Sequence, residues 1–364
     1  MDKNLEKLIQ KRVELLYAKS HSSSIMERLK SQIAFYKNKI DAFKHNKSRA
    51  MTEKDVVLIT YADQVSTKNE MPLKTLGSFL KKYCINSINS VHILPFFPYS
   101  SDDGFSVVDY KKVNPDVGDW SDIEELRKDF HLMFDAVINH ISAKSDWFKE
   151  FLAGNPKYKD FFITCDPSED LSEVTRPRSL PLLTKFDTSE GEKWVWTTFS
   201  EDQVDLNFDS PELALAVMDI LLFYASKGAS IIRFDAIAYI WKKVGTNCIH
   251  LKEVHEFVKL MKNVFDAVAP HVTIITETNV PHKENISYFG ENGDEAQMIY
   301  QFTLPPLTAH AILRQDSVAI REWARTLEHP GYGNTYFNFT ASHDGVGLRP
   351  ASGIISDDEI DFLA

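Results

Sequence analysis

The spacing of hydrophobic residues along the chain changes near residue 55. In residues 2–43, apolar side chains recur at near-helical intervals, which predicts a mostly helical segment. The serine-rich stretch 19–24 interrupts this pattern and predicts the turn of an αα-hairpin. We therefore expect residues 1–50 to form an N-terminal helical extension that packs on the rest of the chain, with a partner-binding arm as the alternative.

From residue 55 onward, short apolar runs alternate with segments of helical periodicity. The runs contain few polar residues, which is typical of strands buried on both faces of a parallel sheet. We predict strands at 56–61, 90–95, within 132–140, at 229–232 and at 272–277, and helices at 73–83, 120–130, 211–227 and 250–269. Ser121, with Glu124 three residues later, predicts a capping box at the start of the second of these helices.

Repeated strand–helix units over this length favour an α/β fold, a (β/α)8 TIM barrel. A doubly wound sheet is the alternative, but no glycine-rich phosphate turn opens it. Asp235 follows His140 by 95 residues, whereas one strand–helix unit takes roughly 30. We therefore expect an inserted, loop-rich subdomain at 141–199. Only 20 residues follow Asp344, so we expect the catalytic barrel, 51–364, to be C-terminally truncated.

Composition narrows the choice of partners and location. The formal charge of -11 argues against nucleic acid and anionic membranes as partners. The sequence contains no apolar run long enough for a membrane span, and its start is charged, unlike a signal peptide. Three widely spaced cysteines give neither a disulfide framework nor a zinc site. We expect a cytoplasmic protein that binds small molecules, with no nucleic-acid and no membrane partner.

The segment Arg233-Phe234-Asp235-Ala236 directly follows the apolar run 229–232. Side chains two residues apart on a strand point to the same side, so Arg233 should lie beside Asp235. We expect this cation to lower the pKa of Asp235 and keep it ionised, as a covalent glycosidase-type nucleophile requires. Taken alone, the segment is explained as well by a structural arginine–aspartate pair.

Motifs with acidic residues or histidine follow five strands of the chain. They occupy 100–105, 135–140, 233–236, 276–278 and 341–345. Because the carboxyl ends of barrel strands share one mouth, these motifs should surround a single pocket, where crowded carboxylates take separate acid and base roles. Each motif alone has a structural explanation, such as a polar pair for Asn139 and His140 or a salt bridge for Glu277. Five such motifs, each at the end of a strand of the same predicted barrel, favour a catalytic site.

In the same order, these motifs resemble the signature regions of the α-amylase superfamily, and the resemblance covers about residues 56–364. More narrowly, the chain resembles the sucrose phosphorylase branch. The matching stretches are Arg176-Pro177-Arg178, Asp202-Gln203-Val204-Asp205, Phe234-Asp235-Ala236 with Tyr239, and Leu304-Pro305-Pro306-Leu307. Within that branch, the run 96–105 and the N-terminal extension are most similar to glucosylglycerate phosphorylases.

The resemblance implies a retaining α-glucoside phosphorylase that works by double displacement and releases glucose 1-phosphate from glucosylglycerate. Asp235 would be the nucleophile that forms a β-glucosyl-enzyme, Glu277 the general acid and then base, and Asp344 the stabiliser of the oxocarbenium-like transition state. Retention needs two carboxyl groups about 5 Å apart, one ionised and one protonated. Glu277 has no cationic neighbour in the sequence that would favour its ionised form.

The same resemblance implies the binding residues. Those that would bind or orient the glucoside are Asp102, Phe105, His140, Gln203, Arg233, Tyr239 and His343. Arg178, in the inserted segment, would bind phosphate, a role that suits the forked guanidinium. The alternative for Arg178 is a surface arginine in a proline-flanked loop.

Other functions remain open at this level. A sucrose phosphorylase would use fructose in place of glycerate, and an α-glucoside hydrolase would use water. A non-catalytic relative would tend to lose Asp235, Glu277 and Asp344. We expect no metal, since no surplus of acidic residues accompanies Asn139, near which amylases often bind calcium. We expect no cofactor beyond inorganic phosphate as co-substrate, and a homodimer is a candidate assembly.

Overall fold

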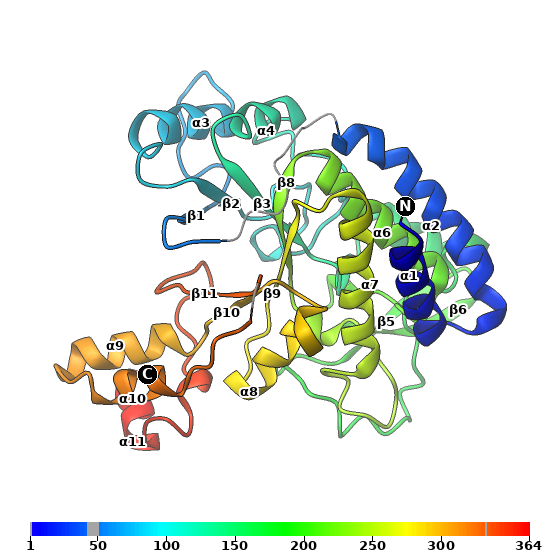
Figure 1. The fold of residues 1–364 in the computed structure, drawn as a ribbon. Helices are drawn as coiled ribbons and strands as arrows, with labels where there is room; N and C mark the ends of the chain where they lie inside the picture. The colour runs from blue at the N-terminus through cyan, green and yellow to red at the C-terminus, as the bar shows by residue number, and fades with distance from the viewer. Residues whose placement is uncertain (1, 42–50, 332) are drawn as a thin grey trace.

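The computed structural model describes residues 2–41, 51–331 and 333–364, and its main element is a seven-stranded sheet. The strand order is β1-β2-β3-β8-β9-β10-β11, and all neighbouring pairs are parallel. The strands span Val57–Thr60, Ser90–Ile93, His131–Ala136, Ala229–Phe234, Thr273–Thr276, Met298–Tyr300 and Thr335–Phe337. Helices occur between successive strands along the chain (Figure 1), which is the predicted TIM-barrel-like α/β fold.

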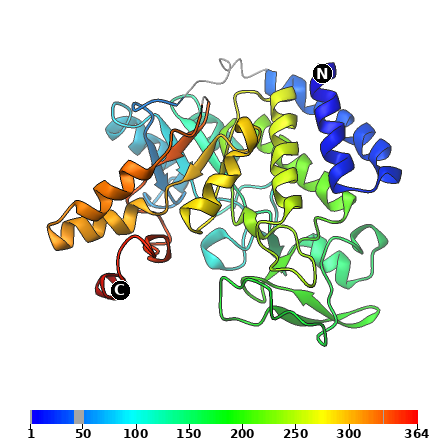
Figure 2. The same cartoon turned by 60° about the horizontal axis from the view of Figure 1, so that its bottom comes forward.

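The helices surround this sheet. They are α1 Lys3–Leu16, α2 Lys19–Asp41, α3 Pro72–Tyr83, α4 Trp120–Leu126, α5 Asp146–Leu152, α6 Pro211–Ser226, α7 Lys252–Val268, α8 His282–Asn285, α9 Leu304–Arg314, α10 Val318–Thr326 and α11 Asp357–Leu363. α3 packs against α4 beside the β1–β3 end of the sheet, and α9, α10 and α11 form a separate group (Figures 1 and 2). In the described part of the chain, no helix is long and apolar enough to cross a membrane.

The start of α4 differs from the prediction. Its N-cap is Asp119, whose carboxylate accepts from the backbone N–H of Ser121 at 2.7 Å, while the Asp122 carboxylate accepts from the N–H of Asp119 at 3.0 Å. The predicted box of Ser121 and Glu124 is therefore wrong, because an aspartate two residues earlier already satisfies the exposed N–H groups.

The N-terminal helices pack as a pair against α6 and α7 (Figure 2). The predicted turn at 19–24 is wrong. Helix α1 ends at Leu16, Tyr17 and Ala18 form the connection, and α2 begins at Lys19. Ser22 is accommodated in this helix because it is buried and its hydroxyl donates to the carbonyl of Lys19 at 2.9 Å, so packing outweighs its low helix propensity. The predicted continuation of the extension through residues 42–50 lies outside the described residues.

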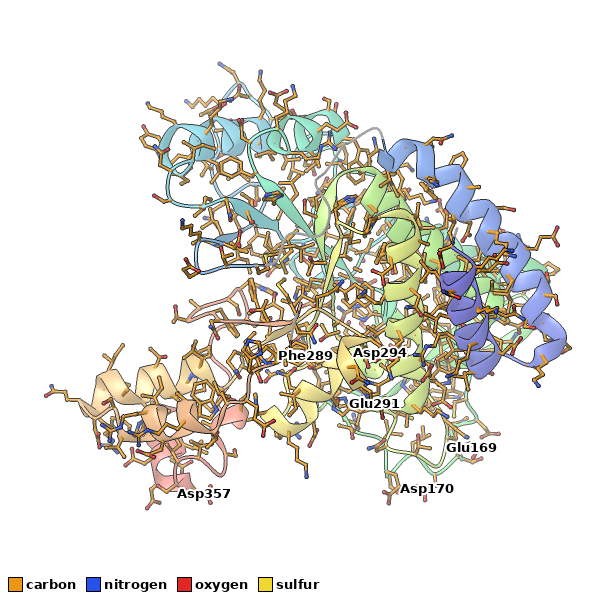
Figure 3. All side chains as sticks on the ribbon, viewed as in Figure 1. Glu169, Asp170, Phe289, Glu291, Asp294 and Asp357 are labelled. Carbon is orange, nitrogen blue, oxygen red and sulfur yellow. The ribbon has the colours of Figure 1, made fainter. Side chains whose placement is uncertain are left out.

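A charged contact fixes α1 to the barrel. The guanidinium of Arg12, which is mostly buried, contacts Glu256 of α7 at 2.7 Å and Asp294 at 2.9 Å. Asp294, labelled in Figure 3, lies in the loop before β10. Removing either partner would leave a mostly buried guanidinium N–H without an acceptor, so this contact also fixes the position in which α1 packs.

The domain boundaries predicted from the sequence remain a prediction.

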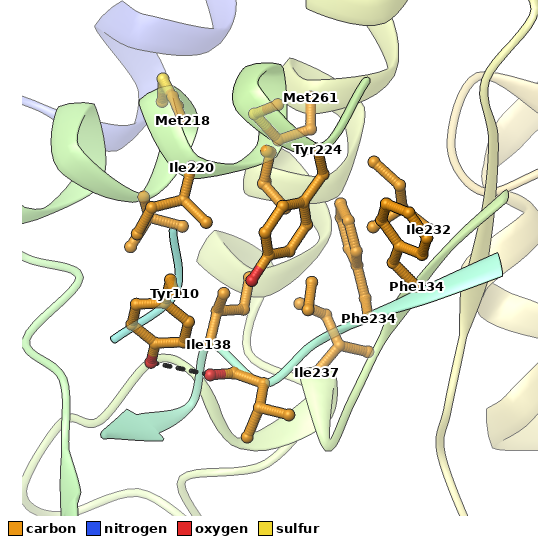
Figure 4. Packing of buried hydrophobic residues seen from close by; sticks show 14 of the residues in the cluster. Tyr110, Phe134, Ile138, Met218, Ile220, Tyr224, Ile232, Phe234, Ile237 and Met261 are labelled. Atoms are coloured by element: carbon orange, nitrogen blue, oxygen red, sulfur yellow. Dashed lines mark hydrogen bonds between the residues drawn. The ribbon is translucent and has the colours of Figure 1, made fainter. Parts of the chain in front are cut away.

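Aromatic residues fill the space between the sheet and α6 (Figure 4). Phe134 of β3 packs edge-on against Tyr224 of α6, which stacks on Phe97 with ring centroids 5.2 Å apart. All three are fully buried, and truncating such a ring typically costs about 3–5 kcal/mol. Nearby, the Tyr110 hydroxyl lies 2.8 Å from the carbonyl oxygens of both Val137 and His140 and shares its one proton between them. That pair of bonds fixes the turn that carries the chain from β3 to His140.

The inserted segment begins and ends in a small two-stranded sheet. β4, His140–Ser142, pairs antiparallel with β7, Gln203–Asp205. Between them lie α5 and a hairpin of β5, Leu183–Thr188, with β6, Gly191–Trp196. Glu169 and Asp170 are on its outer side in Figure 3. The β4–β7 pairing places His140 opposite Asp205 and Ser142 opposite Gln203, next to the carboxyl ends of the main strands.

Candidate active site

The loops at the carboxyl ends of the strands enclose a cavity of about 500 Å³. All of the predicted site residues line it: Asp102, Phe105, His140, Arg178, Gln203, Arg233, Asp235, Tyr239, Glu277, His343 and Asp344. A larger cavity of about 770 Å³, along β1 and β11, contains none of them. The structure thus brings the strand-end motifs to one pocket, while the roles of the individual residues remain predictions.

Arg233 is at the centre of the buried charges. One guanidinium nitrogen, Nη1, donates to Asp235 and, at 2.6 Å, to Oδ1 of Asp135. The other oxygen of Asp135 is 2.7 Å from Nε2 of His92. Burial raises the pKa of Asp135, but contacts with His92 and Arg233 outweigh it and lower the pKa to about 2. Asp135 is therefore a permanently ionised anchor for the arginine.

The net effect on Asp235 differs from the prediction. Arg233 does lie beside it and does lower its pKa. Burial acts in the opposite direction and is larger, and the Asp135 carboxylate adds to it, so the pKa of Asp235 is raised. The sequence showed the arginine but neither the burial nor the second aspartate that shares it.

Glu277 follows β9 and lies half-buried near Asp235. Burial raises its pKa to about 7, with a further contribution from the charge of Asp235 and an opposing one from Arg233. Its Oε2 accepts from the backbone N–H of Ala236 at 3.0 Å. Ala236 is in the left-handed region with a φ of 48°, an uncommon conformation for alanine that aims this N–H at the carboxyl group.

A hydrogen-bonded set connects the inserted segment to the loop after β2. Nε2 of Gln203 donates to Asp102 at 2.8 Å and to the Phe105 carbonyl at 3.3 Å. The same carbonyl accepts from Nε2 of His140 at 2.9 Å. Burial lowers the pKa of His140, so the ring is neutral near pH 7 and holds one proton for this bond.

The loop that carries Asp102 has an unusual backbone. Asp102, Asp103 and Gly104 all have positive φ, at 55°, 48° and 106°. A side chain on Gly104 would place its Cβ 2.7 Å from the carbonyl oxygen of Pro95, so only glycine fits there. The two aspartates tolerate the left-handed region better than most residues. This conformation turns Asp102 and Phe105 toward the cavity.

Asp202 holds the same loop from the other side, a role that sequence reasoning missed. Its carboxylate accepts hydrogen bonds from the hydroxyls of Ser100, Ser101 and Ser106, the last at 2.8 Å. Burial raises the pKa of Asp202, but the three hydrogen bonds together lower it by more, so the net shift is downward. The signal was present as serines in this loop, since Ser100 and Ser101 lie inside the predicted motif 100–105, but only tertiary contact joins them to Asp202.

His343 and Asp344 form the opposite wall. The His343 ring stacks on Phe105 with centroids 5.0 Å apart and planes 3° apart. Its Nε2 is 3.3 Å from Oδ2 of Asp344, whose side chain is 69% exposed. On the inserted segment, Arg178 has Nη2 3.8 Å from Oδ2 of Asp102. Asp344 and Arg178 are thus the charged groups most open to a ligand among the predicted residues.

A lysine occupies the position where calcium was considered. Lys242 donates from Nζ to Oδ1 of Asn139 at 2.6 Å and contacts Asp205 at 2.5 Å. Both Lys242 and Asp205 are buried, so the ammonium compensates the carboxylate inside the protein. Within the described ranges, no cluster of three His, Cys, Asp or Glu side chains could hold a metal ion.

Comparison with known proteins identifies the family. The catalytic domain of α-amylase, as a family, matches residues 79–348. This chain belongs to the α-amylase family. A glucosylglycerate phosphorylase of Spirochaeta thermophila is 58% identical over 85% of this chain and 52% of its own length. One from Escherichia coli K12 is 48% identical over 95% of this chain and 61% of its own. The chain spans about half to three fifths of these relatives.

The fold is found in solved structures of the family. The crystal structure of sucrose 6F-phosphate phosphorylase from Thermoanaerobacter thermosaccharolyticum matches with a TM-score of 0.76 and 28% identity, covering 86% of this chain and 64% of that one. Chemically, the cavity offers a carboxylate bound to arginine, a second carboxyl that stays protonated to about pH 7, and cations at the rim. That set suits glucosyl transfer between a hydroxyl and an anionic acceptor.

Proposed function

We propose that this chain carries the catalytic centre of a retaining α-glucoside phosphorylase that acts on glucosylglycerate. The observation that carries the proposal is the pair Asp235 and Glu277. Arg233 donates a hydrogen bond to Asp235 and favours its ionised form, whereas the raised pKa of Glu277, about 7, leaves about half of this carboxyl group protonated at neutral pH. One ionised and one protonated carboxyl group in a single pocket are what retention requires.

In the first step, the Asp235 carboxylate forms a bond to the anomeric carbon as the glycosidic bond breaks. Glu277 gives its proton to the departing oxygen, and glycerate leaves. In the second step, a phosphate oxygen attacks the same carbon, the bond to Asp235 breaks, and Glu277 takes the proton of the incoming phosphate. Two inversions give α-glucose 1-phosphate with retained configuration.

The surrounding residues account for the other requirements. His140, Gln203 and Asp102 are held in one network and would bind the glucosyl hydroxyls. Phe105 and His343 would offer a flat apolar surface, and Arg178, exposed at the rim, would bind phosphate. Relatives 48–58% identical that are named glucosylglycerate phosphorylases support the choice of acceptor.

The test uses glucose 1-phosphate as donor in the full-length protein, with glycerate, fructose or glycerol supplied separately. Phosphate release with glycerate, and its loss in Asp235→Asn, is expected. Release with fructose alone would make the protein a sucrose phosphorylase. Phosphate-independent hydrolysis of an α-glucoside, with no transfer to any acceptor, would make it a hydrolase. The cytoplasmic location and the homodimer remain predictions.

A further inference from the structure

The cavity contains an arginine that no prediction above includes. Arg349 lines it together with Arg178 and Arg233. Arg233 is engaged by Asp135 and Asp235, and Arg178 lies 3.8 Å from Asp102. For the Arg349 guanidinium, the described residues supply no hydrogen bond and no ion pair, although its side chain faces a cavity rich in carboxylates. Arg349 is therefore available to a ligand anion.

The backbone around Arg349 is firmly placed. The short 3-10 helix Arg349–Ala351 comes five residues after Asp344. Pro350 and Ala351 are buried, and the Thr303 hydroxyl donates to the Pro350 carbonyl at 3.3 Å. Only the arginine of this turn is exposed, so the fold presents its side chain to the cavity from an anchored base.

The position of Arg349 is on the Glu277 side of the cavity. The loop before it passes close to the loop after β9, since a Cβ on Gly347 would lie 3.2 Å from Nδ2 of Asn279, two residues beyond Glu277. The hydroxyl of Tyr239 responds to both groups: burial and Glu277 raise its pKa, and Arg349 opposes them. Arg349, Glu277 and Tyr239 thus line one cavity, and the tyrosine is within electrostatic reach of both charged residues.

The chemistry of the acceptor suggests what Arg349 binds. Glu277 would protonate the oxygen through which the acceptor leaves. In a 2-hydroxy acid that oxygen is on the carbon next to the carboxylate, so the carboxylate must lie on the Glu277 side. A guanidinium there can pair with both carboxylate oxygens, which a neutral polyol cannot match.

We propose that Arg349 is the specificity-determining residue that binds the carboxylate of a hydroxycarboxylate acceptor. The inference rests on the proposed function and adds to it the group that selects the acceptor. It assigns the acceptor carboxylate to Arg349, while the phosphate that replaces the acceptor on the Glu277 side keeps its proposed contact with Arg178, on the inserted segment.

The test compares Arg349→Met and Arg349→Lys with the wild type in the full-length protein. The matched control is Arg321→Met, at an exposed arginine of α10. With glucose 1-phosphate as donor, kcat/KM is measured for glycerate and for glycerol, which lacks the carboxylate. We expect Arg349→Met to lower the value for glycerate by roughly 10- to 100-fold and the value for glycerol by less than about 3-fold. Arg349→Lys should fall between, and Arg321→Met should change neither.

The ratio of the two acceptors does not depend on how much of a preparation is folded. Equal losses for both acceptors, an unchanged value for glycerate, or an effect of Arg349→Met mainly on KM for glucose 1-phosphate would each overturn the inference. Calorimetric binding of glycerate without donor separates this from failure of the proposed function. The inference requires binding to the wild type that Arg349→Met abolishes, whether or not the protein is a phosphorylase.

Discussion

Replacing Asp135 with asparagine tests the charge arrangement at the base of the site. Asp135 is completely buried in β3, and its two oxygens face Arg233 at 2.6 Å and His92 at 2.7 Å. Asparagine keeps the size and one acceptor oxygen but removes the charge. The positive charge of Arg233 would then be compensated by Asp235 alone. Arg233 is buried, so water cannot solvate the remaining charge.

The pKa of Asp135 gives the expected size. It falls from an ordinary value of 3.8 to about 2 in the folded protein. This lowering of the pKa corresponds to about 2 kcal/mol of stability. Because the folded-state pKa is depressed, this contribution is complete above about pH 4 and is lost as pH falls toward 2. Breaking a buried pair by removing one partner costs about 3–5 kcal/mol, so we expect a loss of about 2–5 kcal/mol at pH 7.

The assay is urea unfolding followed by tryptophan fluorescence, from pH 7 down to the lowest pH at which both proteins fold. Asp129→Asn is the matched control, since Asp129 pairs with Lys81 at the surface and should contribute about 0–1 kcal/mol. The difference between wild type and Asp135→Asn should shrink below pH 4. A difference that is below 1 kcal/mol at pH 7, or that does not change with pH, would refute the assigned charge state.

Three further outcomes follow from the site. Transfer activity of the wild type should decline as pH rises through about 7, because Glu277 is the proposed acid and must be protonated in that role. Glu277→Gln should slow transfer by about 10²–10⁴-fold, and a flat pH profile of initial rates would contradict the proposed role. Lys242→Met should destabilise by about 3–5 kcal/mol, since buried Asp205 loses its cation, and unchanged thermal unfolding would refute it. Asp202→Asn should raise KM for the glucoside by roughly 10-fold with little change in kcat, because the loop of Ser101 loosens; a selective loss of kcat would contradict a positioning role.

The sequence predicted the barrel because its strands are apolar runs and its functional residues follow them. Position at a strand end is a local property, so Asp235 and Glu277 could be assigned to one mouth before any contact was known. The strands Met298–Tyr300 and Thr335–Phe337 were not predicted. Each has only three residues, too few for periodicity to separate a strand from a loop.

What could not be predicted is contact between distant segments. Asp202 lies about a hundred residues from the serines that it binds, and His92 is 43 residues from Asp135. His92 was visible as a polar residue in an apolar strand, but its partner depends on the strand register. The direction of the pKa shift of Asp235 was wrong for the same reason, since burial is set by the whole fold.

The arrangement of charges around Arg233 also explains how Glu277 can change roles. In the free site, burial and the Asp235 carboxylate both raise the pKa of Glu277, which favours the acid. In the proposed intermediate, Asp235 would carry the glucosyl group as an ester and lose its negative charge, while Arg233 would keep its second partner, Asp135, and stay in place. The repulsion that held the proton on Glu277 disappears and the attraction of Arg233 remains. In the proposed mechanism the pKa of Glu277 would therefore fall when the intermediate forms, and the same carboxyl group would serve as the base in the second step.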